Sequence, residues 1–277
     1  MSIIQVIIFA IVQGITELFP VSSVAHGIFV PTILHWNTVL TNPAFLPFVV
    51  MLHLGTAVAL FFYFLKDWVH FFRSPFRKDP GSSKDRKTFL LVIVATIPAG
   101  LVGLLLEHKL KDLFTSGRSA AIFLIVNAFV LFLGDRLRRN TRSDHLSLDL
   151  HELSYGKAIF VGLCQCLALI PGFSRSGVSM VGGLMTGLKY EAAARFTFLL
   201  ATPLIGGAAL LEVPKLLKGD HHYLVMALLG GVISGIAAYL STTFLMKWFK
   251  SHEVQALRPF GYYCLIAGIL VLVLTMF

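Results

Sequence analysis

The chain has 277 residues, of which 56% are hydrophobic and only 13% are charged, and its mean hydropathy is +0.80. This composition excludes an ordinary soluble domain and is typical of membrane proteins with several spans. The 23 Lys and Arg residues outnumber the 14 Asp and Glu residues. They lie mainly in connecting segments, where the positive-inside rule accounts for them. We therefore expect no nucleic-acid partner.

The first apolar region, residues 3–40, is broken in its middle by Pro20-Val-Ser-Ser. Proline ends a helix because it removes a backbone donor and clashes with the preceding turn. Each half of the region is short for a full crossing of a bilayer. The sequence therefore predicts a re-entrant helical hairpin, whose turn lies near mid-membrane and must be covered by protein or a wet cavity.

Three spanning helices are expected after this hairpin, and the pattern then repeats. Residues 155–190 are again apolar and are broken at Pro171-Gly-Phe-Ser-Arg-Ser-Gly, which predicts a second re-entrant hairpin because glycine permits the chain to reverse. Three more spans follow. The six predicted spans, each long enough to cross a bilayer as a helix, are residues 46–65, 88–106, 119–135, 192–212, 223–246 and 259–277.

The charged connections agree with this layout. Most of the basic residues outside the predicted spans lie in segments 66–87, 136–157 and 247–258. With six spans and two re-entrant hairpins, all three segments fall on the same side of the membrane, which the positive-inside rule assigns to the cytoplasm. The less basic connections, 107–118 and 213–222, fall on the other side.

The order of one hairpin and three spans occurs twice, in residues 1–150 and 151–277. Because each half has an odd number of spans, the second half must be inverted relative to the first. Inverted repeats bring two broken helices together near the membrane midplane. The predicted fold is a single all-α polytopic membrane domain with six transmembrane helices, two re-entrant hairpins and an inverted repeat. This arrangement would bring Glu17, Ser23 and His26 to face Arg175.

Gln13 and Glu17 are four residues apart, so they share one face of the predicted helix. A carboxylate at membrane depth is costly and is kept when it has a partner, a wet cavity or a function. A carboxylate with a neighbouring amide oxygen can hold one divalent cation, with water and substrate phosphate as further ligands. The alternative is a packing hydrogen bond between helices.

Ser22, Ser23 and His26 follow the Pro20 break. If a helix restarts there, one of the two serines is suited to be its N-cap. His26 lies three residues after Ser23, close enough on one helical face to act as its base or as an acid for a leaving group. A structural role for His26 is the alternative.

Arg175 lies between Ser174 and Ser176 and shortly after Gly172. Arginine offers a rigid fork of donors that matches phosphate oxygens. The serine hydroxyls and the free amides at a helix start add donors, and the helix dipole favours an anion there. The alternative is a structural ion pair between Arg175 and Glu17, which a substrate could open.

Three polar residues within the predicted spans give a weaker signal. His53 and Thr56 could line a cavity or pack in the core, and Asn127 is expected to bond between helices.

At the two motifs the chain resembles the bacterial undecaprenyl-diphosphate phosphatases, the bacitracin-resistance family. That family carries an (E/Q)xxxE element that leads into PVSSxxH, and a PGxSRSG element. In this chain Gln13 and Glu17 lead into Pro20-Val-Ser-Ser-Val-Ala-His26, and residues 171–177 read PGFSRSG. The similarity in length and hydropathy extends over the whole chain.

The resemblance implies a multi-pass enzyme of the bacterial inner membrane that removes the terminal phosphate of undecaprenyl diphosphate. Its product is the lipid carrier for peptidoglycan synthesis, and its recycling confers bacitracin resistance. The resemblance also implies a divalent cation (Mg²⁺ or Ca²⁺) at Gln13 and Glu17, and a site open to the periplasmic side. Ser23 and His26 would be the nucleophile and base candidates, with Glu17 and Arg175 also catalytic. The residues expected to bind the substrate phosphates are Ser22, Gly172, Ser174, Arg175 and Ser176.

The expected partners are the polyprenyl diphosphate lipid and the bilayer, and the sequence is compatible with a homodimer. The main alternative function is a polyprenyl-phosphate flippase or transporter, because inverted repeats and broken helices also build secondary transporters. A flippase would need the Arg175 cradle but neither a Ser23–His26 pair nor a metal.

Overall fold

The computed structural model of the protein describes residues 1–277 except 37–44, 107–116, 141–147, 218–220, 253–254 and 276–277. Parts of the predicted segments 3–40, 107–118, 136–157, 213–222, 247–258 and 259–277 therefore lie outside the described residues. The α-helices are α1 (Ile3–Thr16), α2 (Ser23–Ile33), α4 (Phe45–Tyr63), α5 (Leu65–Arg73), α6 (Pro80–Leu105), α8 (Gly117–Asn140), α9 (Tyr155–Cys166), α10 (Arg175–Met185), α11 (Tyr190–Leu217), α12 (His221–Ser251) and α13 (Arg258–Leu274). The 3₁₀ helices are η1 (Ser74–Phe76), η3 (Leu150–Glu152) and η4 (Leu167–Leu169).

The described helices differ in their ability to cross a membrane. Four of them, α6, α8, α11 and α12, are long and apolar enough to do so. The bent pair α4 and α5 is a fifth candidate. Helix α13 has 17 residues and belongs with the shorter apolar helices α1, α2 and α9. The predicted all-α membrane class is thus confirmed at the level of four or five candidate spans.

The predicted span 46–65 ends earlier than expected. The chain bends by 69° between α4 and α5, after Tyr63. Helix α5 is amphipathic, since it buries Trp68 and Phe71 while Lys66 and Arg73 are exposed. A short helix with one apolar and one charged face is suited to the membrane surface rather than the hydrocarbon core, which accounts for the bend.

In each helical hairpin the turn contains a proline, and the second helix begins directly after a serine that caps it. After Pro20, Ser22 is the N-cap of α2, and its hydroxyl accepts a hydrogen bond from the Ala25 amide. After Pro171, Ser174 caps α10 in the same way. Such caps satisfy amides that a helix leaves unpaired at its start. The sequence signals for the two breaks are therefore confirmed.

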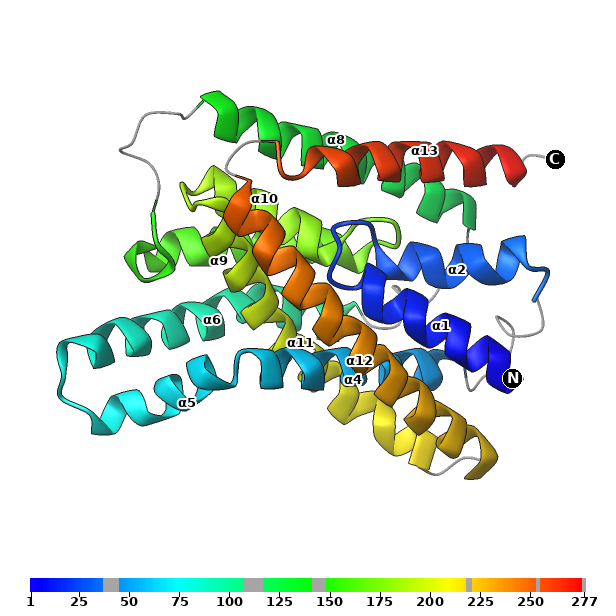
Figure 1. The fold of residues 1–277 in the computed structure, drawn as a ribbon, viewed down its shortest axis with the longest axis horizontal. Helices are drawn as coiled ribbons and strands as arrows, with labels where there is room; N and C mark the ends of the chain where they lie inside the picture. The colour runs from blue at the N-terminus through cyan, green and yellow to red at the C-terminus, as the bar shows by residue number, and fades with distance from the viewer. Residues whose placement is uncertain (37–44, 107–116, 141–147, 218–220, 253–254, 276–277) are drawn as a thin grey trace.

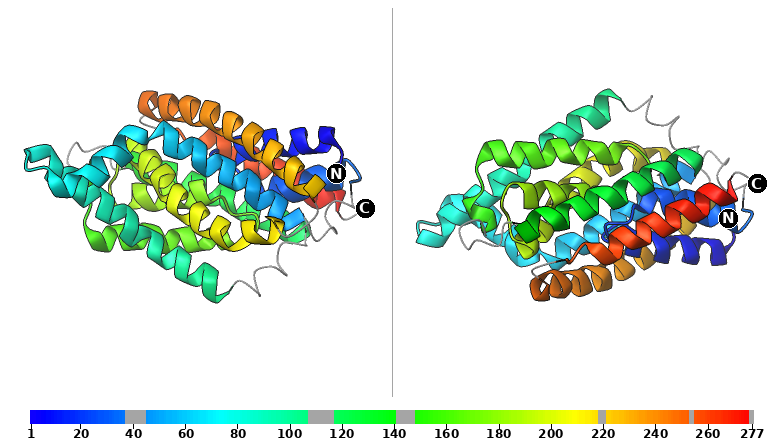
Figure 2. Two further views of the ribbon diagram at one scale, coloured as in Figure 1. Left: turned by 90° about the horizontal axis from the view of Figure 1, so that it is seen from below. Right: turned by 90° about the horizontal axis from the view of Figure 1, so that it is seen from above.

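The two hairpins approach each other from opposite ends of the molecule. In Figure 1, α1 and α2 extend from the end that carries both chain termini, whereas α9 and α10 extend from the other end. Their turns meet in the interior, beside α8 and α4. Helices α8 and α13 lie side by side along one edge, as the views of Figure 2 also show.

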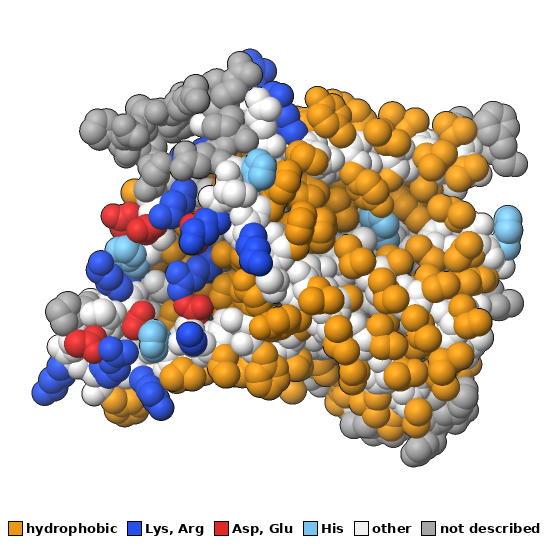
Figure 3. Space-filling model, in the orientation of Figure 1, with side chains coloured by type: hydrophobic (Ala, Val, Ile, Leu, Met, Phe, Trp, Pro, Cys, Tyr) orange, Lys and Arg blue, Asp and Glu red, His pale blue; other side chains and the backbone are white. Residues whose placement is uncertain are grey.

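The charged side chains gather at the end opposite the termini. Figure 3 shows Lys, Arg, Asp and Glu side chains at this end and a mostly hydrophobic surface elsewhere on that face. The basic residues of α5, the following turn and the start of α6 are exposed there, among them Lys66, Arg77 and Arg86. This distribution is typical of a protein whose apolar belt lies in a bilayer and whose charged end lies in water.

Candidate active site

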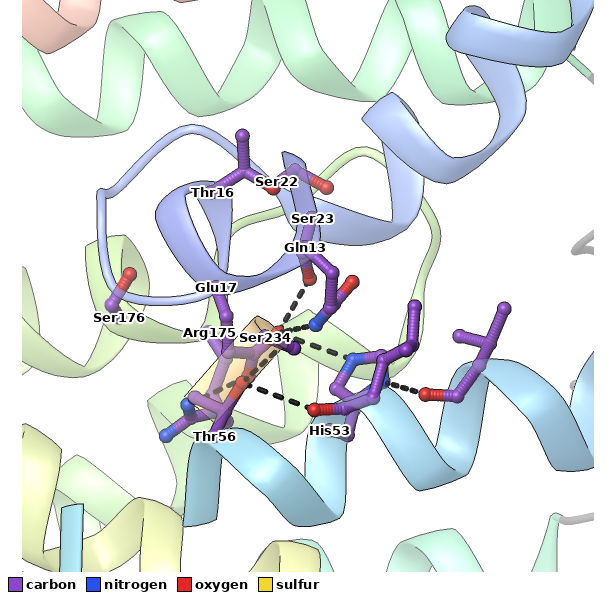
Figure 4. A network of polar contacts seen from close by, with 12 residues as sticks. Gln13, Thr16, Glu17, Ser22, Ser23, His53, Thr56, Arg175, Ser176 and Ser234 are labelled. Atoms are coloured by element: carbon purple, nitrogen blue, oxygen red, sulfur yellow. Dashed lines mark hydrogen bonds and ion pairs between the residues drawn. The ribbon is translucent and has the colours of Figure 1, made fainter. Parts of the chain in front are cut away.

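The carboxylate of Glu17 is the centre of a buried polar network that joins both hairpins (Figure 4). Glu17 directly follows α1 and is 7% exposed. Its Oε2 accepts hydrogen bonds from Ser23 Oγ at 2.5 Å and Gln13 Nε2 at 3.0 Å, and His53 Nε2 lies 3.1 Å from the same oxygen. Its Oε1 accepts from Arg175 Nη2 at 2.8 Å. Four side chains thus converge on one carboxylate.

These groups come from four helices. Gln13 lies in α1, Ser23 is the first residue of α2, His53 lies in α4, and Arg175 is the first residue of α10. The predictions that Gln13 and Glu17 share a helix face and that Glu17 faces Arg175 are confirmed. Ser23 also reaches the site, as expected.

Asn127 in α8 holds the two hairpin turns together. Its Nδ2 donates to the Pro20 carbonyl at 3.1 Å, and its Oδ1 accepts from the Ser174 amide at 3.1 Å. Asn127 is fully buried. The expected interhelical role of Asn127 is confirmed, and its two bonds fix the position of one turn relative to the other.

The serines of the second motif contact the first hairpin. Ser176 Oγ donates to the Phe19 carbonyl at 3.1 Å, and Ser174 Oγ lies 3.0 Å from Ser176 Oγ. The Ser22 hydroxyl caps α2 by accepting from the Ala25 amide, and the Ser22 backbone has an unusual φ of 65°. In this arrangement the three hydroxyls bind protein groups, so their predicted binding of phosphate stays a prediction.

Gly172 lies against α8 rather than in the network. Its φ is 107°, and a Cβ at this position would lie 2.4 Å from the Ala120 carbonyl oxygen and 2.6 Å from Phe123 Cβ. Glycine is therefore required here both for the left-handed backbone and for the close approach to the helix. This packing explains Gly172 without a phosphate, and its predicted binding role stays a prediction.

One guanidinium nitrogen of Arg175, Nη1, is not used in the Glu17 network. The Arg175 side chain is 11% exposed, and Nη2 binds Glu17 while the buried Nη1 has no hydrogen-bond partner among the described residues. An unpaired guanidinium donor away from water is costly, and a second anionic oxygen would satisfy it. In this arrangement one arm of the fork is bound to Glu17, and the predicted binding of phosphate by Arg175 stays a prediction.

The structure does not place the His26 ring against Ser23, and the predicted catalytic role of His26 stays a prediction. His26 Nδ1 lies 2.7 Å from the Ser22 carbonyl, to which it donates, and Nε2 lies 2.7 Å from the Tyr263 hydroxyl, with the two rings stacked. Because the hydroxyl of Ser23 donates to Glu17 instead, the carboxylate rather than the imidazole is placed to accept its proton. Helical spacing put His26 within reach of Ser23 but did not set the direction of its ring.

The sequence reasoning did not assign His53 to the site. Its Nδ1 lies 2.8 Å from the Val49 carbonyl, which turns Nε2 toward Glu17. A histidine within an apolar span was the available signal, since ionisable groups at membrane depth mark functional sites. Thr56, one turn further on, contacts Ser234 of α12 at 3.3 Å and belongs to the packing of α4.

The predicted metal residues fit a cation only in part. Glu17 carries a carboxylate and Gln13 an amide oxygen, and both are hard ligands, but in this arrangement Gln13 turns its amide nitrogen toward Glu17. Among the described residues, no group of three or more His, Cys, Asp or Glu side chains could hold a metal. The carboxylate also already contacts Arg175. A cation at Glu17 would therefore need most of its ligands from substrate and water.

The helical membrane fold and the buried site, with its hydroxyl–carboxylate pair and its guanidinium, place this chain among integral membrane proteins that carry out phosphate chemistry. The chain belongs to the bacitracin resistance protein BacA family, which matches residues 6–270. It is 49% identical to undecaprenyl-diphosphatase 2 of Chromobacterium violaceum, over 97% of both chains. It is 48% identical to undecaprenyl-diphosphatase of Acidiphilium cryptum, over 98% of this chain and 97% of the relative, and 47% identical to that of Granulibacter bethesdensis, over 97% and 95%.

Proposed function

We propose that this protein is an undecaprenyl-diphosphatase, which hydrolyses undecaprenyl diphosphate to undecaprenyl phosphate and inorganic phosphate. Membership of the BacA family and the names of relatives that match nearly the full chain support this function. The reaction recycles the lipid carrier for peptidoglycan synthesis, which is how it would confer bacitracin resistance. The observation that carries the proposal is the contact of Glu17 with both Ser23 and Arg175.

The site has the parts for transfer of a phosphoryl group to a hydroxyl. Ser23 Oγ attacks the terminal phosphorus while its proton passes to Glu17 Oε2, 2.5 Å away. The bond from phosphorus to the bridging oxygen breaks, and undecaprenyl phosphate leaves with the electron pair. Water then attacks the phosphoserine and releases inorganic phosphate and the Ser23 hydroxyl. Arg175 neutralises the phosphate oxygens, since positioning and charge neutralisation dominate such reactions.

A divalent cation, Mg²⁺ or Ca²⁺, is part of the proposal. Glu17 and the amide oxygen of Gln13 would hold it, together with oxygens of the diphosphate and water. When bound, it would supply further positive charge to the substrate phosphates. The presence of a single carboxylate supports a cation that binds with the substrate rather than before it.

An apolar groove of about 560 Å³ offers a path for the prenyl chain. The groove lies between α1 and α12 and is lined by Ile11, Ile15, Phe19, Ile233, Ile236, Ala237, Leu240, Ser241 and Phe244. Phe19 lines the groove and also belongs to the first hairpin turn, where its carbonyl accepts from Ser176. A lipid chain in this groove would remain at the bilayer while its diphosphate reaches Arg175.

The proposed topology is the one predicted from the sequence: one membrane domain with six spans, two re-entrant hairpins and inverted halves, residues 1–150 and 151–277. Reciprocal packing supports it. Helix α1 packs on α12 and α9 packs on α6. A Cβ on Gly14 would lie 2.3 Å from the Ser234 carbonyl oxygen, and a Cβ on Gly162 would lie 2.3 Å from that of Ala95. Equivalent close contacts in exchanged halves are typical of a two-fold relationship.

The proposed location is the bacterial inner membrane, with the basic end of Figure 3 in the cytoplasm. The exposed basic residues of the segment 66–87 support this orientation by the positive-inside rule. The α1–α2 hairpin then enters from the periplasmic side, and the site opens toward that side.

The test is phosphate release from a long-chain prenyl diphosphate by the purified protein in detergent. Wild type is measured with and without a chelator, beside Glu17→Ala and the surface control Asp85→Ala. Release by wild type and Asp85→Ala that is lost in Glu17→Ala supports the function and the site. If a chelator does not change phosphate release, only the proposed requirement for a divalent cation is overturned. A folded wild type that releases no phosphate would overturn the hydrolase, and flux into sealed vesicles would then test the flippase.

A further inference from the structure

His53 lies between two hydrogen-bond acceptors. Its Nδ1 faces the Val49 carbonyl at 2.8 Å, and its Nε2 faces Glu17 Oε2 at 3.1 Å. A carbonyl and a carboxylate can only accept, so the imidazole donates from both nitrogens in this arrangement. His53 therefore acts toward Glu17 as a second hydrogen-bond donor from outside α1 and α2, beside Arg175.

His53 and Arg175 contact different oxygens of Glu17. Arg175 binds Oε1, whereas His53 binds Oε2, the oxygen that also accepts from the Ser23 hydroxyl. Arg175 also has the unpaired donor Nη1. A diphosphate offers several anionic oxygens that match the guanidinium fork. We expect Arg175 to turn from Glu17 toward the substrate when the diphosphate binds.

Glu17 would then lose the donor on its Oε1, and the direction of its carboxylate would depend on the donors that remain. Gln13 and Ser23 donate to it but are neutral, and the Ser23 proton is the one that leaves in the proposed reaction. Of the described groups that contact Glu17, His53 in α4 is the one that comes from outside the two hairpins.

His53 is also independent of the hairpin turns. It lies in α4, and α4 packs closely on α12, since a Cβ on Gly55 would lie 1.9 Å from the Gly231 carbonyl oxygen. Its ring direction is set by Val49 in the same helix. A rearrangement of Arg175 at the start of α10 would therefore leave the contact from His53 to Glu17 in place.

We propose that His53 is a positioning residue that keeps Glu17 Oε2 beside the Ser23 hydroxyl while Arg175 is bound to the substrate diphosphate. This inference rests on the proposed hydrolysis. It predicts that His53 affects turnover more than substrate binding, because it acts on Glu17 and not on the phosphates.

The experiment compares His53→Leu, which removes the donor, with His53→Gln, whose side-chain amide can donate toward the same oxygen. The same two substitutions at His70, an exposed histidine of α5, are the matched controls. Phosphate release gives kcat and KM, and elution and thermal unfolding in detergent report folding. We expect His53→Leu to lower kcat about 10- to 100-fold with KM changed about twofold or less. His53→Gln should fall between His53→Leu and wild type.

A double-mutant cycle with Glu17→Gln separates positioning from a general structural effect. If His53 acts through Glu17, His53→Leu should change the residual activity of Glu17→Gln by about twofold or less, since coupled residues are not additive. An equal loss in both backgrounds would overturn the proposal. So would wild-type turnover in His53→Leu, or equal losses in folded His53→Leu and His53→Gln. An inactive wild type would instead overturn the proposed hydrolysis.

Discussion

Arg175 Nη2 and Glu17 Oε1 lie 2.8 Å apart, although the two residues are 158 positions apart in the chain. The side chains are 11% and 6% exposed. The pair joins the turn of one hairpin to the turn of the other, and each charge compensates its partner at a depth where water does not. Removal of either partner leaves the other charge buried, which is more unfavourable than removal of both.

The Arg175 guanidinium is expected to be essential for turnover. Arg175→Ala should lower kcat/KM about 100- to 1,000-fold, the usual effect of removing a donor that stabilises developing charge. Arg175→Lys should recover only part of this loss, because an ammonium lacks the planar fork. Phosphate-release kinetics of detergent-purified variants provide the measurement. Turnover of Arg175→Ala at the wild-type level would refute the assignment of Arg175 to the substrate phosphates.

Ser23 is expected to be the nucleophile and Glu17 its base. Ser23→Ala should reduce phosphate release to the level of Glu17→Gln, and the double variant should be no worse than either, because the two residues act as a unit. Ser179→Ala is the matched control: Ser179 is a buried serine of α10 whose hydroxyl has no hydrogen-bond partner within the described part of the chain. Strong activity of Ser23→Ala would favour an attacking water.

His26 is expected to matter less than Ser23. Because its ring nitrogens contact the Ser22 carbonyl and Tyr263, Tyr263→Phe and His26→Gln should affect kcat by a smaller factor than Ser23→Ala. Parallel steady-state assays of the three variants decide the order. If His26→Gln alone abolished release, a histidine-based or water-based mechanism would replace the serine mechanism.

Gly172 is expected to determine stability rather than chemistry. In Gly172→Ala, the new methyl group would meet the Ala120 carbonyl oxygen at 2.4 Å and the left-handed backbone would be strained. Together these effects should cost about 1–3 kcal/mol. Thermal unfolding in detergent measures the loss. Gly156→Ala is the control, since a Cβ there meets nothing within 4 Å. Equal midpoints for the two variants would contradict the packing argument.

The exposed ion pair of Asp149 with Lys189 predicts a small dependence of stability on pH. The hydrogen bond from Lys189 holds the pKa of Asp149 below its usual range. A lowered folded-state pKa stabilises the protein above the unfolded pKa of about 3.9, and this contribution is lost as the pH falls through the folded value. Because both side chains are about half exposed, at 41% and 50%, the effect should be at most about 1 kcal/mol.

The check is the unfolding midpoint of Asp149→Asn relative to wild type at neutral and acidic pH. Asparagine keeps the size of the side chain at the N-cap position of η3 but removes the charge. The variant should be slightly less stable at pH 7, and the difference should vanish in acid. A difference that persists or grows in acid would contradict the assigned sign. Lys189→Gln should behave like Asp149→Asn.

The sequence predicted the helical class and both hairpin breaks because these depend on local chemistry. Apolar runs, the prolines at residues 20 and 171, and the N-cap serines act within a few residues of chain, and each break lies where the pattern placed it. The number of spans was harder to predict from the sequence. The run at 46–65 reads as one apolar helix, but the amphipathic face of α5 bends it after Tyr63.

The site shows the same division. The residue types at Gln13, Glu17, Ser23 and Arg175 identified a buried polar centre, because unpaired charge is unfavourable at membrane depth. The partner of each group depended on side-chain directions and on helices distant in sequence. The structure turned His26 to Tyr263, brought in His53 from α4 and placed Asn127 between the turns. Spacing along one helix fixes which residues share a face, but only the packed fold decides which atom meets which.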